Sequence, residues 1–155
     1  MEIQPIEHQH VASCATLFLS VFNSPPWNEA WPATAAMRRL EDLFRTPGFY
    51  GLLAVDGTGV LGLAMGHAQQ WDRAQHFYLG EMCVVPHRQH SGIGSRIMQT
   101  LCNDLAAAQV EGIYLLTAHS SPAESFYKKQ GFYVSQKMVM MGKNLGERSK
   151  EPTST

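Results

Sequence analysis

The amino-acid sequence predicts a mixed α/β (α+β) fold, with a central β-sheet of about six to seven strands flanked by about four helices. Two observations lead to this prediction: apolar residues switch repeatedly between strand-like and helix-like spacing, and Gly and Pro residues stand at the switches. The 155 residues, of which 45% are hydrophobic and 16% charged, are enough for one substantial core. We therefore expect a single domain over residues 1–145 and a polar, disordered tail over residues 146–155.

The first half of the chain predicts one strand, two helices and a hairpin. Apolar side chains recur with the helical period from Val11 to Phe22, and Pro25 and Pro26 then break the pattern. A turn with the sequence Asp-Gly-Thr-Gly separates two later apolar runs, as in a hairpin. In chain order the expected elements are a strand at 2–6, a helix at 11–22, a helix at 32–44 and two hairpin strands at 49–55 and 60–69.

The second half predicts a strand–helix–strand unit followed by a helix and a last strand. The run at 77–85 is apolar on both faces, so we expect it in the centre of the sheet. A right-handed crossover should make it parallel to the next strand, while the hairpin region before it should be antiparallel. In chain order the expected elements are a strand at 77–85, a helix at 93–108 closed by Gly112, a strand at 113–117, a helix at 122–130 capped by Ser120 or Ser121, and a strand at 132–141.

The charge balance and the cysteines exclude several classes of protein. Twelve Lys and Arg against thirteen Asp and Glu leave a net charge of −1, without the basic surface of a nucleic-acid binder. No apolar run reaches the length of a membrane helix and the start lacks a secretory pattern, so we expect a cytoplasmic protein that acts on neither nucleic acid nor membrane. Cys14, Cys83 and Cys102 are odd in number and far apart, which argues against a disulfide framework or a zinc site.

A glycine-bearing turn connects the expected central strand to the helix that follows it. Gly92 and Gly94 allow the backbone to approach a ligand, and the first N–H groups of the helix have no intrahelical acceptor. Together with the helix dipole they suit a phosphate or pyrophosphate, to which Arg88 or Arg96 could add charge. Such a turn can also serve tight packing alone. Because the loops for triphosphates and dinucleotides have other patterns, a mononucleotide-type cofactor remains.

Two short motifs narrow the choice of cofactor. Residues 89–94, Gln-His-Ser-Gly-Ile-Gly, match Gln/Arg-x-x-Gly-x-Gly/Ala, and residues 123–132 match Ala-x-x-Phe-Tyr-x-x-x-Gly-Phe. In this order they resemble the GNAT (GCN5-related N-acetyltransferase) family over nearly the whole chain, which implies the GNAT fold and acetyl-CoA as co-substrate. His90 and Ser91 depart from the small or basic residues usual there, and Ser120 stands where an asparagine is frequent. The positions that the resemblance assigns to acetyl-CoA are Met82, Cys83, Val84, Gln89, His90, Ser91, Gly92, Ile93, Gly94, Ser95 and Ser120.

Acetyl transfer from a thioester to an amine needs a base and an acid, because the amine must lose a proton and the departing thiolate must gain one. Glu81 is the only charged residue in the apolar run at 77–85, where loss of solvent would raise its pKa, and we assign it as the base, acting through a water. Tyr127 matches the family tyrosine beside the thioester sulfur and would protonate the thiolate. We expect the two to converge on one cleft. The structural alternatives are a solvated strand-end acid and a tyrosine packed in the core.

A cysteine and two histidines are further candidates. Cys83 lies two residues after Glu81 on the same strand face and could carry the acyl group, but no motif supports this and buried thiols are usually inert. His87 and His90 lack any further ligand pattern, so no metal is expected.

The acceptor side in this family is built from the first two helices and the loop between them. Trp27 and Trp31 could stack on a sugar or a cation, and Glu29 with Asp72 could attract an amine, although the tryptophans could also clamp the loop to the core. This loop and residues 113–117 look loosely similar to aminoglycoside 6'-N-acetyltransferase-like members. An amino sugar, another small-molecule amine and a protein N-terminus are therefore candidate acceptors. The alternative to an enzyme is a non-catalytic acyl-CoA-binding or regulatory module, and the last strand could pair across a homodimer.

Overall fold

The computed structural model of the protein describes residues 1–146. They belong to two compact units, the first spanning Met1–Leu115 and the second beginning at Leu116. The tail expected at 146–155 lies outside the described residues apart from Gly146, and the single domain expected over residues 1–145 stays a prediction. Within the described chain no helix combines the length and the apolar character needed to cross a membrane.

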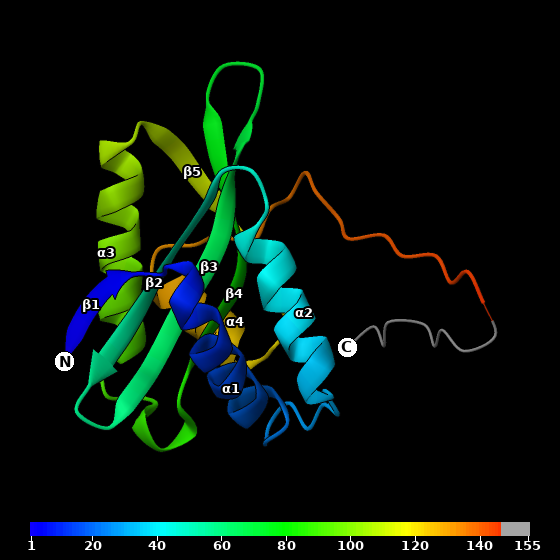
Figure 1. Cartoon of the computed structure of the whole chain (residues 1–155). Coiled ribbons are helices and arrows are strands. Elements are labelled where there is room, and N and C mark those ends of the chain that lie inside the picture. The colour runs from blue at the N-terminus through cyan, green and yellow to red at the C-terminus, as the bar shows by residue number, and fades with distance from the viewer. Residues whose placement is uncertain (147–155) are drawn as a thin grey trace. The chain divides into compact units, whose positions relative to one another are not determined.

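A five-stranded mixed sheet forms the centre of the first unit (Figure 1). Its strands are β1 (Glu2–Pro5), β2 (Phe49–Asp56), β3 (Gly59–Gln70), β4 (Gln75–Val84) and β5 (Val110–Tyr114). They lie in the sheet in chain order, and each of the first three pairs antiparallel with the next. β5 is parallel to β4, as the helix between them requires. The predicted antiparallel hairpin and parallel crossover are therefore confirmed.

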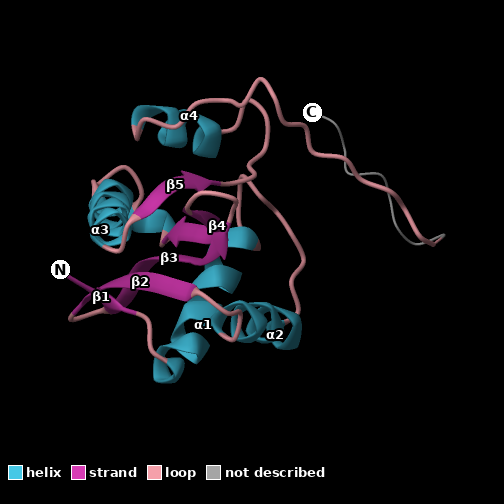
Figure 2. Ribbon diagram, turned by 90° about the horizontal axis from the view of Figure 1, so that it is seen from above, coloured by secondary structure: helices cyan, strands magenta, loops and turns pink. Residues whose placement is uncertain are grey.

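Three α-helices of the first unit cover the two faces of this sheet. They are α1 (Val11–Phe22), α2 (Ala33–Phe44) and α3 (Ile93–Ala107), with short 3₁₀ turns η1 (His8–His10) and η2 (Pro86–Arg88) before α1 and α3. α1 and α2 pack on one face and α3 on the other (Figure 2). α1 buries Val11, Cys14 and Phe18, whose spacing is the helical period seen in the sequence.

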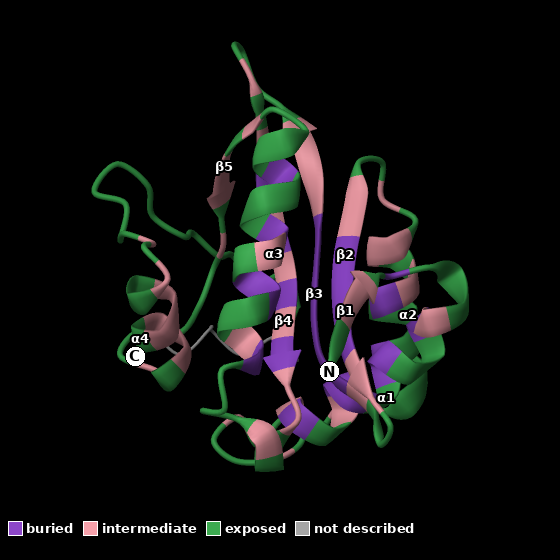
Figure 3. Ribbon diagram, turned by 90° about the vertical axis from the view of Figure 1, so that its left-hand side faces the viewer, coloured by how far each residue is buried: buried purple, intermediate pink, exposed green. Residues whose placement is uncertain are grey.

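The core lies between the sheet and these helices, and the buried segments of β2, β3 and β4 stand out in Figure 3. Leu53, Leu63 and Met65 pack with α1 and α2. On the other face Gly62 leaves room for Ile97 of α3, because a Cβ at Gly62 would lie 2.9 Å from its Cδ1 atom. Both faces of the sheet are thus covered, and strand edges and helix margins remain for a site.

The end of α3 differs from the expectation. The pattern predicts a helix closed by Gly112, but α3 ends at Ala107 and Gln109 adopts a left-handed conformation with φ of 63°. β5 accordingly begins at Val110, earlier than predicted. Gly112 lies inside β5, where a Cβ would come 3.0 Å from Nδ1 of His76. This glycine therefore serves close packing between strands and does not end the helix.

Over residues 116–146, the second unit contains one helix, α4 (Pro122–Lys129). Its N-cap is Ser121, whose Oγ accepts a hydrogen bond from the Glu124 N–H at 3.1 Å. The carboxylate of Glu124 in turn accepts from the backbone N–H of Ser120. The predicted serine cap and its position are confirmed.

The strand predicted at 132–141 is not formed, so the prediction of six to seven strands was wrong and the sheet of the described residues has five. Ser135 Oγ accepts a hydrogen bond from the Lys137 N–H at 3.2 Å, and this local bond accompanies a bend in the chain. The side chains of Tyr133 and Met141 are 88% and 87% exposed. An apolar, β-prone run therefore does not become a strand without a paired neighbour and a buried face.

Candidate active site

A β-bulge in β4 decides which face of the sheet Glu81 reaches. Glu81 pairs with Met65 of β3, whereas the next β3 residue, Gly66, pairs with Leu79, so Gly80 is the extra residue. Because side chains alternate with period two, the extra residue turns Glu81 away from the face of Leu79. It points instead toward α2, which contributes its ion-pair partner.

Glu81 and Arg39 form an ion pair between β4 and α2. Arg39 Nε donates to Oε1 of Glu81, and the two side chains are 51% and 8% exposed respectively. Burial raises the pKa of Glu81 above the ordinary glutamate value. Arg39 opposes this rise by favouring the carboxylate, and the negative charge of Glu29 adds to it. Glu81 is therefore a buried carboxyl whose basicity is increased, as the sequence predicted from its apolar surroundings.

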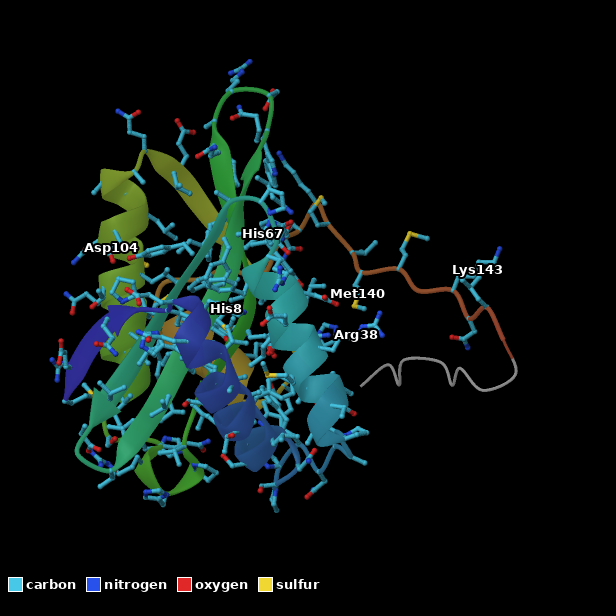
Figure 4. All side chains as sticks on the ribbon, in the orientation of Figure 1. His8, Arg38, His67, Asp104, Met140 and Lys143 are labelled. Atoms are coloured by element: carbon cyan, nitrogen blue, oxygen red, sulfur yellow. The ribbon has the colours of Figure 1, made fainter. Side chains whose placement is uncertain are left out.

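A pocket of about 460 Å³ opens over this ion pair. Its wall combines residues of α2, residues of β4 and one loop tryptophan. They are Trp31, Ala35, Arg38, Arg39, Asp42, Leu43, Tyr78, Gly80 and Glu81. Figure 4 shows Arg38 projecting from α2, on the opposite side of the sheet from Asp104 of α3. The volume suits a small molecule.

Of the residues predicted to bind the acceptor, Trp31 lines this pocket, and Glu29 does not line it but accepts a hydrogen bond from Trp31. The Arg39 guanidinium carbon is 5.5 Å from the centre of the Trp31 ring, and Trp31 Nε1 donates to Glu29 at 3.3 Å. Trp27 instead packs on Phe22, with ring centres 5.6 Å apart. Asp72 is 89% exposed beside Arg73 and does not line the pocket.

The residues that sequence reasoning missed come from α2. Arg38 and Arg39 belong to no sequence motif, although positions 35, 38, 39 and 42 lie on one side of a helix and this spacing is typical of a shared surface. What the spacing could not provide is the partner, because Glu81 is 42 positions away along the chain.

One edge of β4 is uncovered beyond Tyr78. β5 pairs with β4 up to Tyr78, which lies opposite Tyr114 at the end of β5. Within the part of the chain that the structure describes, residues 79–84 pair with β3 alone. The sheet therefore offers a strand edge that an extended ligand can pair with.

The backbone groups of Met82 and Val84 point to this uncovered edge. The Val85 N–H donates to the Leu61 carbonyl of β3 at 2.8 Å, and successive residues of a strand present their backbone groups to opposite edges. Those of Cys83 therefore point to β3. Of the three positions assigned to acetyl-CoA in β4, two face the edge where a ligand could lie.

The glycine turn leaves β4 through two left-handed residues. His90 has φ of 62° and Gly92 has φ of 86°, and Gly92 is the N-cap of α3. The side-chain amide of Gln89 donates to the Val84 carbonyl at 3.0 Å, which ties the turn to the strand end. A left-handed N-cap is a conformation that glycine adopts without strain.

The first turn of α3 presents its amides beyond this cap. Its first intrahelical bond runs from the Arg96 N–H to the Gly92 carbonyl at 3.1 Å. The N–H groups of Ile93 and Gly94 therefore have no acceptor within the helix, and Ser95 belongs to the same turn. These groups suit an anion, as the sequence predicted.

Of the two arginines expected to add charge there, Arg88 is engaged by a neighbouring strand. It lies 3.3 Å from the carboxylate of Asp56, and its carbonyl accepts a hydrogen bond from the Ser91 hydroxyl. These bonds hold the turn and reduce the net charge that Arg88 can offer a phosphate. The backbone amides are therefore the groups of this turn best suited to an anion.

The thiol of Cys83 is poorly suited to be a nucleophile. Burial raises its pKa well above the ordinary cysteine value, and the neighbouring Glu81 and Cys14 raise it further. A thiol held in this state is rarely a thiolate. Among residues 1–146, no cluster of three or more His, Cys, Asp or Glu side chains is arranged as metal ligands are, and neither His87 nor His90 belongs to one.

Tyr127 and Ser120 belong to the second unit, whereas Glu81 belongs to the first. Tyr127 lies on α4, where its ring centre is 5.3 Å from that of Phe126 and 5.5 Å from that of Phe132. Ser120 precedes the helix with φ of 55°. The convergence of Tyr127 and Glu81 on one cleft stays a prediction.

Comparison with solved structures supports the fold. A probable acetyltransferase shares 14% identity, with a TM-score of 0.78, over 95% of this chain and 99% of that one. A possible acetyltransferase from Clostridium difficile 630 shares 11% identity, with a TM-score of 0.79, over 94% and 98%. An aminoglycoside acetyltransferase from an uncultured soil metagenomic sample, solved with sisomicin, shares 16% identity, with a TM-score of 0.73, over 94% and 96%.

Comparison of sequences decides the family. No curated protein gives a significant match. The model of the family described as "Acetyltransferase (GNAT) family" matches residues 16–132, which include the glycine turn and the Phe-Tyr motif. The resemblance inferred from the two motifs is thereby confirmed. With a mixed sheet of the expected order and a family match over most of its length, the chain belongs to the GNAT acetyltransferase family.

Proposed function

We propose that this protein is an N-acetyltransferase that uses acetyl-CoA and transfers the acetyl group to a primary amine of a small molecule. The family membership supports acetyl transfer in general. The observation that carries the finer proposal is the arrangement on β4, where an uncovered strand edge at residues 79–84 includes a buried carboxyl that faces a pocket. A co-substrate paired along that edge would bring its thioester beside Glu81.

The residues present fit acetyl-CoA. The backbone groups of Met82 and the N–H of Val84 are available for the pantetheine arm, whereas the Val84 carbonyl already accepts from Gln89. The first amides of α3 are available for the pyrophosphate. When bound, acetyl-CoA supplies an acetyl group activated as a thioester. Backbone amides add nothing to the charge count, so a net charge of −1 is compatible with a phosphate-bearing ligand.

Glu81 acts as the base in this proposal. An ammonium has no lone pair, so the acceptor must lose a proton before its nitrogen can bond to the acetyl carbon. The Glu81 carboxylate takes this proton through a water, and burial, which raises the pKa of Glu81, makes it the stronger base.

Tyr127 acts as the acid. As the nitrogen–carbon bond forms, the carbon–sulfur bond breaks, and the phenol gives its proton to the departing thiolate. The net change is one amide and one thiol from one amine and one thioester. The motif around Tyr127 supports this role, which requires α4 to reach the thioester end of the site.

The experiment is CoA thiol release from acetyl-CoA with a panel of amines. The panel contains amino acids, diamines, amino sugars and a peptide with a free N-terminus, since the structure of one neighbour holds the aminoglycoside sisomicin. Tyr127→Phe should lower kcat about 10²-fold with little change in the Kd for CoA. Tyr133→Phe, at an 88% exposed tyrosine of the same unit, is the matched control.

A non-catalytic acyl-CoA-binding module is the alternative from another class. Tight binding of CoA without turnover of any amine would contradict the enzyme proposal and favour that module. Turnover with the peptide alone would move the acceptor to protein N-termini. The cytoplasmic location, the homodimer and the absence of nucleic-acid and membrane partners stay predictions from the sequence.

A further inference from the structure

The charges of the residues that line the acceptor pocket are balanced. Arg38 and Arg39 stand against Asp42 and Glu81 on its wall. The Arg38–Asp42 pair is loose, at 3.9 Å, with both side chains largely exposed. A polycationic acceptor would therefore meet two guanidinium groups for every two carboxylates and would gain little from the pocket's electrostatics.

Arg39 lines the pocket beside the base. Its Nε donates to Glu81, and its guanidinium lies over the Trp31 ring, so its charge stands next to the carboxylate. An ammonium group that comes to Glu81 must lie close to this fixed positive charge. The two cations repel each other, which weakens the binding of an acceptor that carries positive charge alone.

The Arg39 guanidinium has further N–H donors on its terminal nitrogens. Of its five N–H groups, the bond to Glu81 uses the one at Nε, and within residues 1–146 no other hydrogen bond or ion pair engages Arg39. The side chain is 51% exposed, so its terminal nitrogens can be reached from the pocket. Two parallel N–H groups on one guanidinium match the two oxygens of a carboxylate.

We propose that the acceptor is a primary amine that carries a carboxylate, as an amino acid does, and that Arg39 is the residue that selects it. This inference rests on the proposed function. The acceptor carboxylate pairs with the terminal nitrogens of Arg39 and neutralises the charge that would repel the ammonium. The ammonium then lies beside Glu81, which removes its proton.

The pocket also offers room for the rest of such a molecule. Trp31, Ala35 and Leu43 supply an apolar wall, while Tyr78 lies on the β4 side. An amino acid with an apolar or aromatic side chain would bury that side chain there. The carboxylate of such an acceptor can pair with Arg39 and its ammonium with Glu81, the two partners of the pocket's ion pair.

The test compares acceptors that differ in one charge. L-amino acids and their carboxamides are assayed as pairs for CoA thiol release, with putrescine and sisomicin as cationic acceptors. The wild-type protein should prefer the acid over its amide about 10- to 100-fold in kcat/KM. The ratio is measured on one protein sample, so partial misfolding of a variant does not alter it.

Arg39→Gln should reduce the acid-to-amide ratio of kcat/KM to near unity, mainly by raising KM for the acid. Arg39→Lys should retain part of the ratio because the positive charge stays, and should lose the rest because lysine lacks the two paired donors. Arg45→Gln is the matched control. Arg45 lies at the end of the same helix and is ion-paired with Glu41 at 2.8 Å, outside the pocket. This variant should leave the ratio unchanged.

The outcomes separate the acceptor class from the reaction. Equal or better turnover of the amides, of putrescine or of sisomicin would overturn the inference and leave the N-acetyltransferase proposal standing. Titration calorimetry with CoA present gives the same acid-to-amide ratio as affinities. A protein that binds the acids selectively without turnover would contradict the reaction and support the acceptor class, and one that neither binds nor turns over any amine would contradict both.

Discussion

In the ion pair between Arg39 and Glu81, the carboxylate is buried and the guanidinium is about half exposed. The carboxylate is 8% exposed and the guanidinium 51% exposed, and both residues line the pocket. The pair joins α2 to the β4 bulge and links the helix that lines the pocket to the strand that carries the base. Several measurable properties depend on it.

The pH profile of the reaction should report Glu81 and respond to Arg39. The rate should rise with pH as Glu81 loses its proton. Arg39 lowers the pKa of Glu81, so Arg39→Gln should move this rise to higher pH, while Glu29 continues to raise that pKa. The measurement is kcat/KM against pH with one acceptor, so that the acceptor's own pKa is common to all proteins. Arg45→Gln should give the wild-type profile; an unmoved rise in Arg39→Gln would argue against Glu81 as the base.

Glu81→Gln should stabilise the protein while abolishing most of its activity. The folded state holds the Glu81 proton more tightly than the unfolded state, so wild-type stability falls as pH rises from the unfolded pKa through the raised folded pKa. The variant should therefore be more stable at neutral pH, by roughly 0.5–2 kcal/mol, and lose this advantage near pH 4. Denaturant melts across this range measure it. Glu111→Gln, at an exposed position of β5, should show no such trend.

The β4 bulge should not tolerate a side chain at Gly66. A Cβ there would lie 2.6 Å from Cε1 of the fully buried Phe77 and still closer to the carbonyl oxygen of Tyr78. Because backbone and core must both shift, Gly66→Ala should cost about 3 kcal/mol or more in the free energy of unfolding. Gly57→Ala, with nothing within 4 Å of the new Cβ, should be nearly neutral. Chemical denaturation compares the two, and equal stabilities would refute the close approach.

The left-handed cap at Gly92 should matter for acetyl-CoA. No atom lies within 4 Å of a Cβ built there, so the effect of Gly92→Ala comes from its φ of 86° alone. That strain costs about 1–2 kcal/mol and should turn the first amides of α3, raising KM for acetyl-CoA about 10-fold with a smaller change in kcat. Gly92→Asn should recover part of the affinity, because Asn tolerates this conformation. Steady-state kinetics and CoA calorimetry distinguish this from a loss confined to stability.

Cys83 should be dispensable for chemistry. Its buried thiol has a pKa well above the ordinary value, and its backbone groups point to β3. Cys83→Ala should therefore keep kcat within about 3-fold and lose about 1 kcal/mol of stability from the small cavity. Mass spectrometry after mixing wild-type protein with acetyl-CoA should find no acetylated Cys83. An acetyl adduct that disappears when amine is added would require the two-step route instead.

The sequence by itself determined the features that depend on neighbours along the chain. The helical period predicted α1 and α2, the turn residues predicted the hairpin, and the glycines at 92 and 94 with the Phe-Tyr motif predicted the family. Glu81 was recognisable as a candidate base because it is a single charge in an apolar run. Propensity, period and turn chemistry are local properties, so they can be read before the chain folds.

The tertiary structure alone decided the direction of Glu81 and its partner. The bulge that turns it toward α2 is a matter of register between β3 and β4, and a shift by one residue sends every side chain of a strand to the other face. Arg39, 42 positions away, meets Glu81 only because α2 packs on that face. The absence of a strand at 132–141 also depends on tertiary structure. A strand forms only when it pairs with another strand, and the sequence of the segment does not specify that partner.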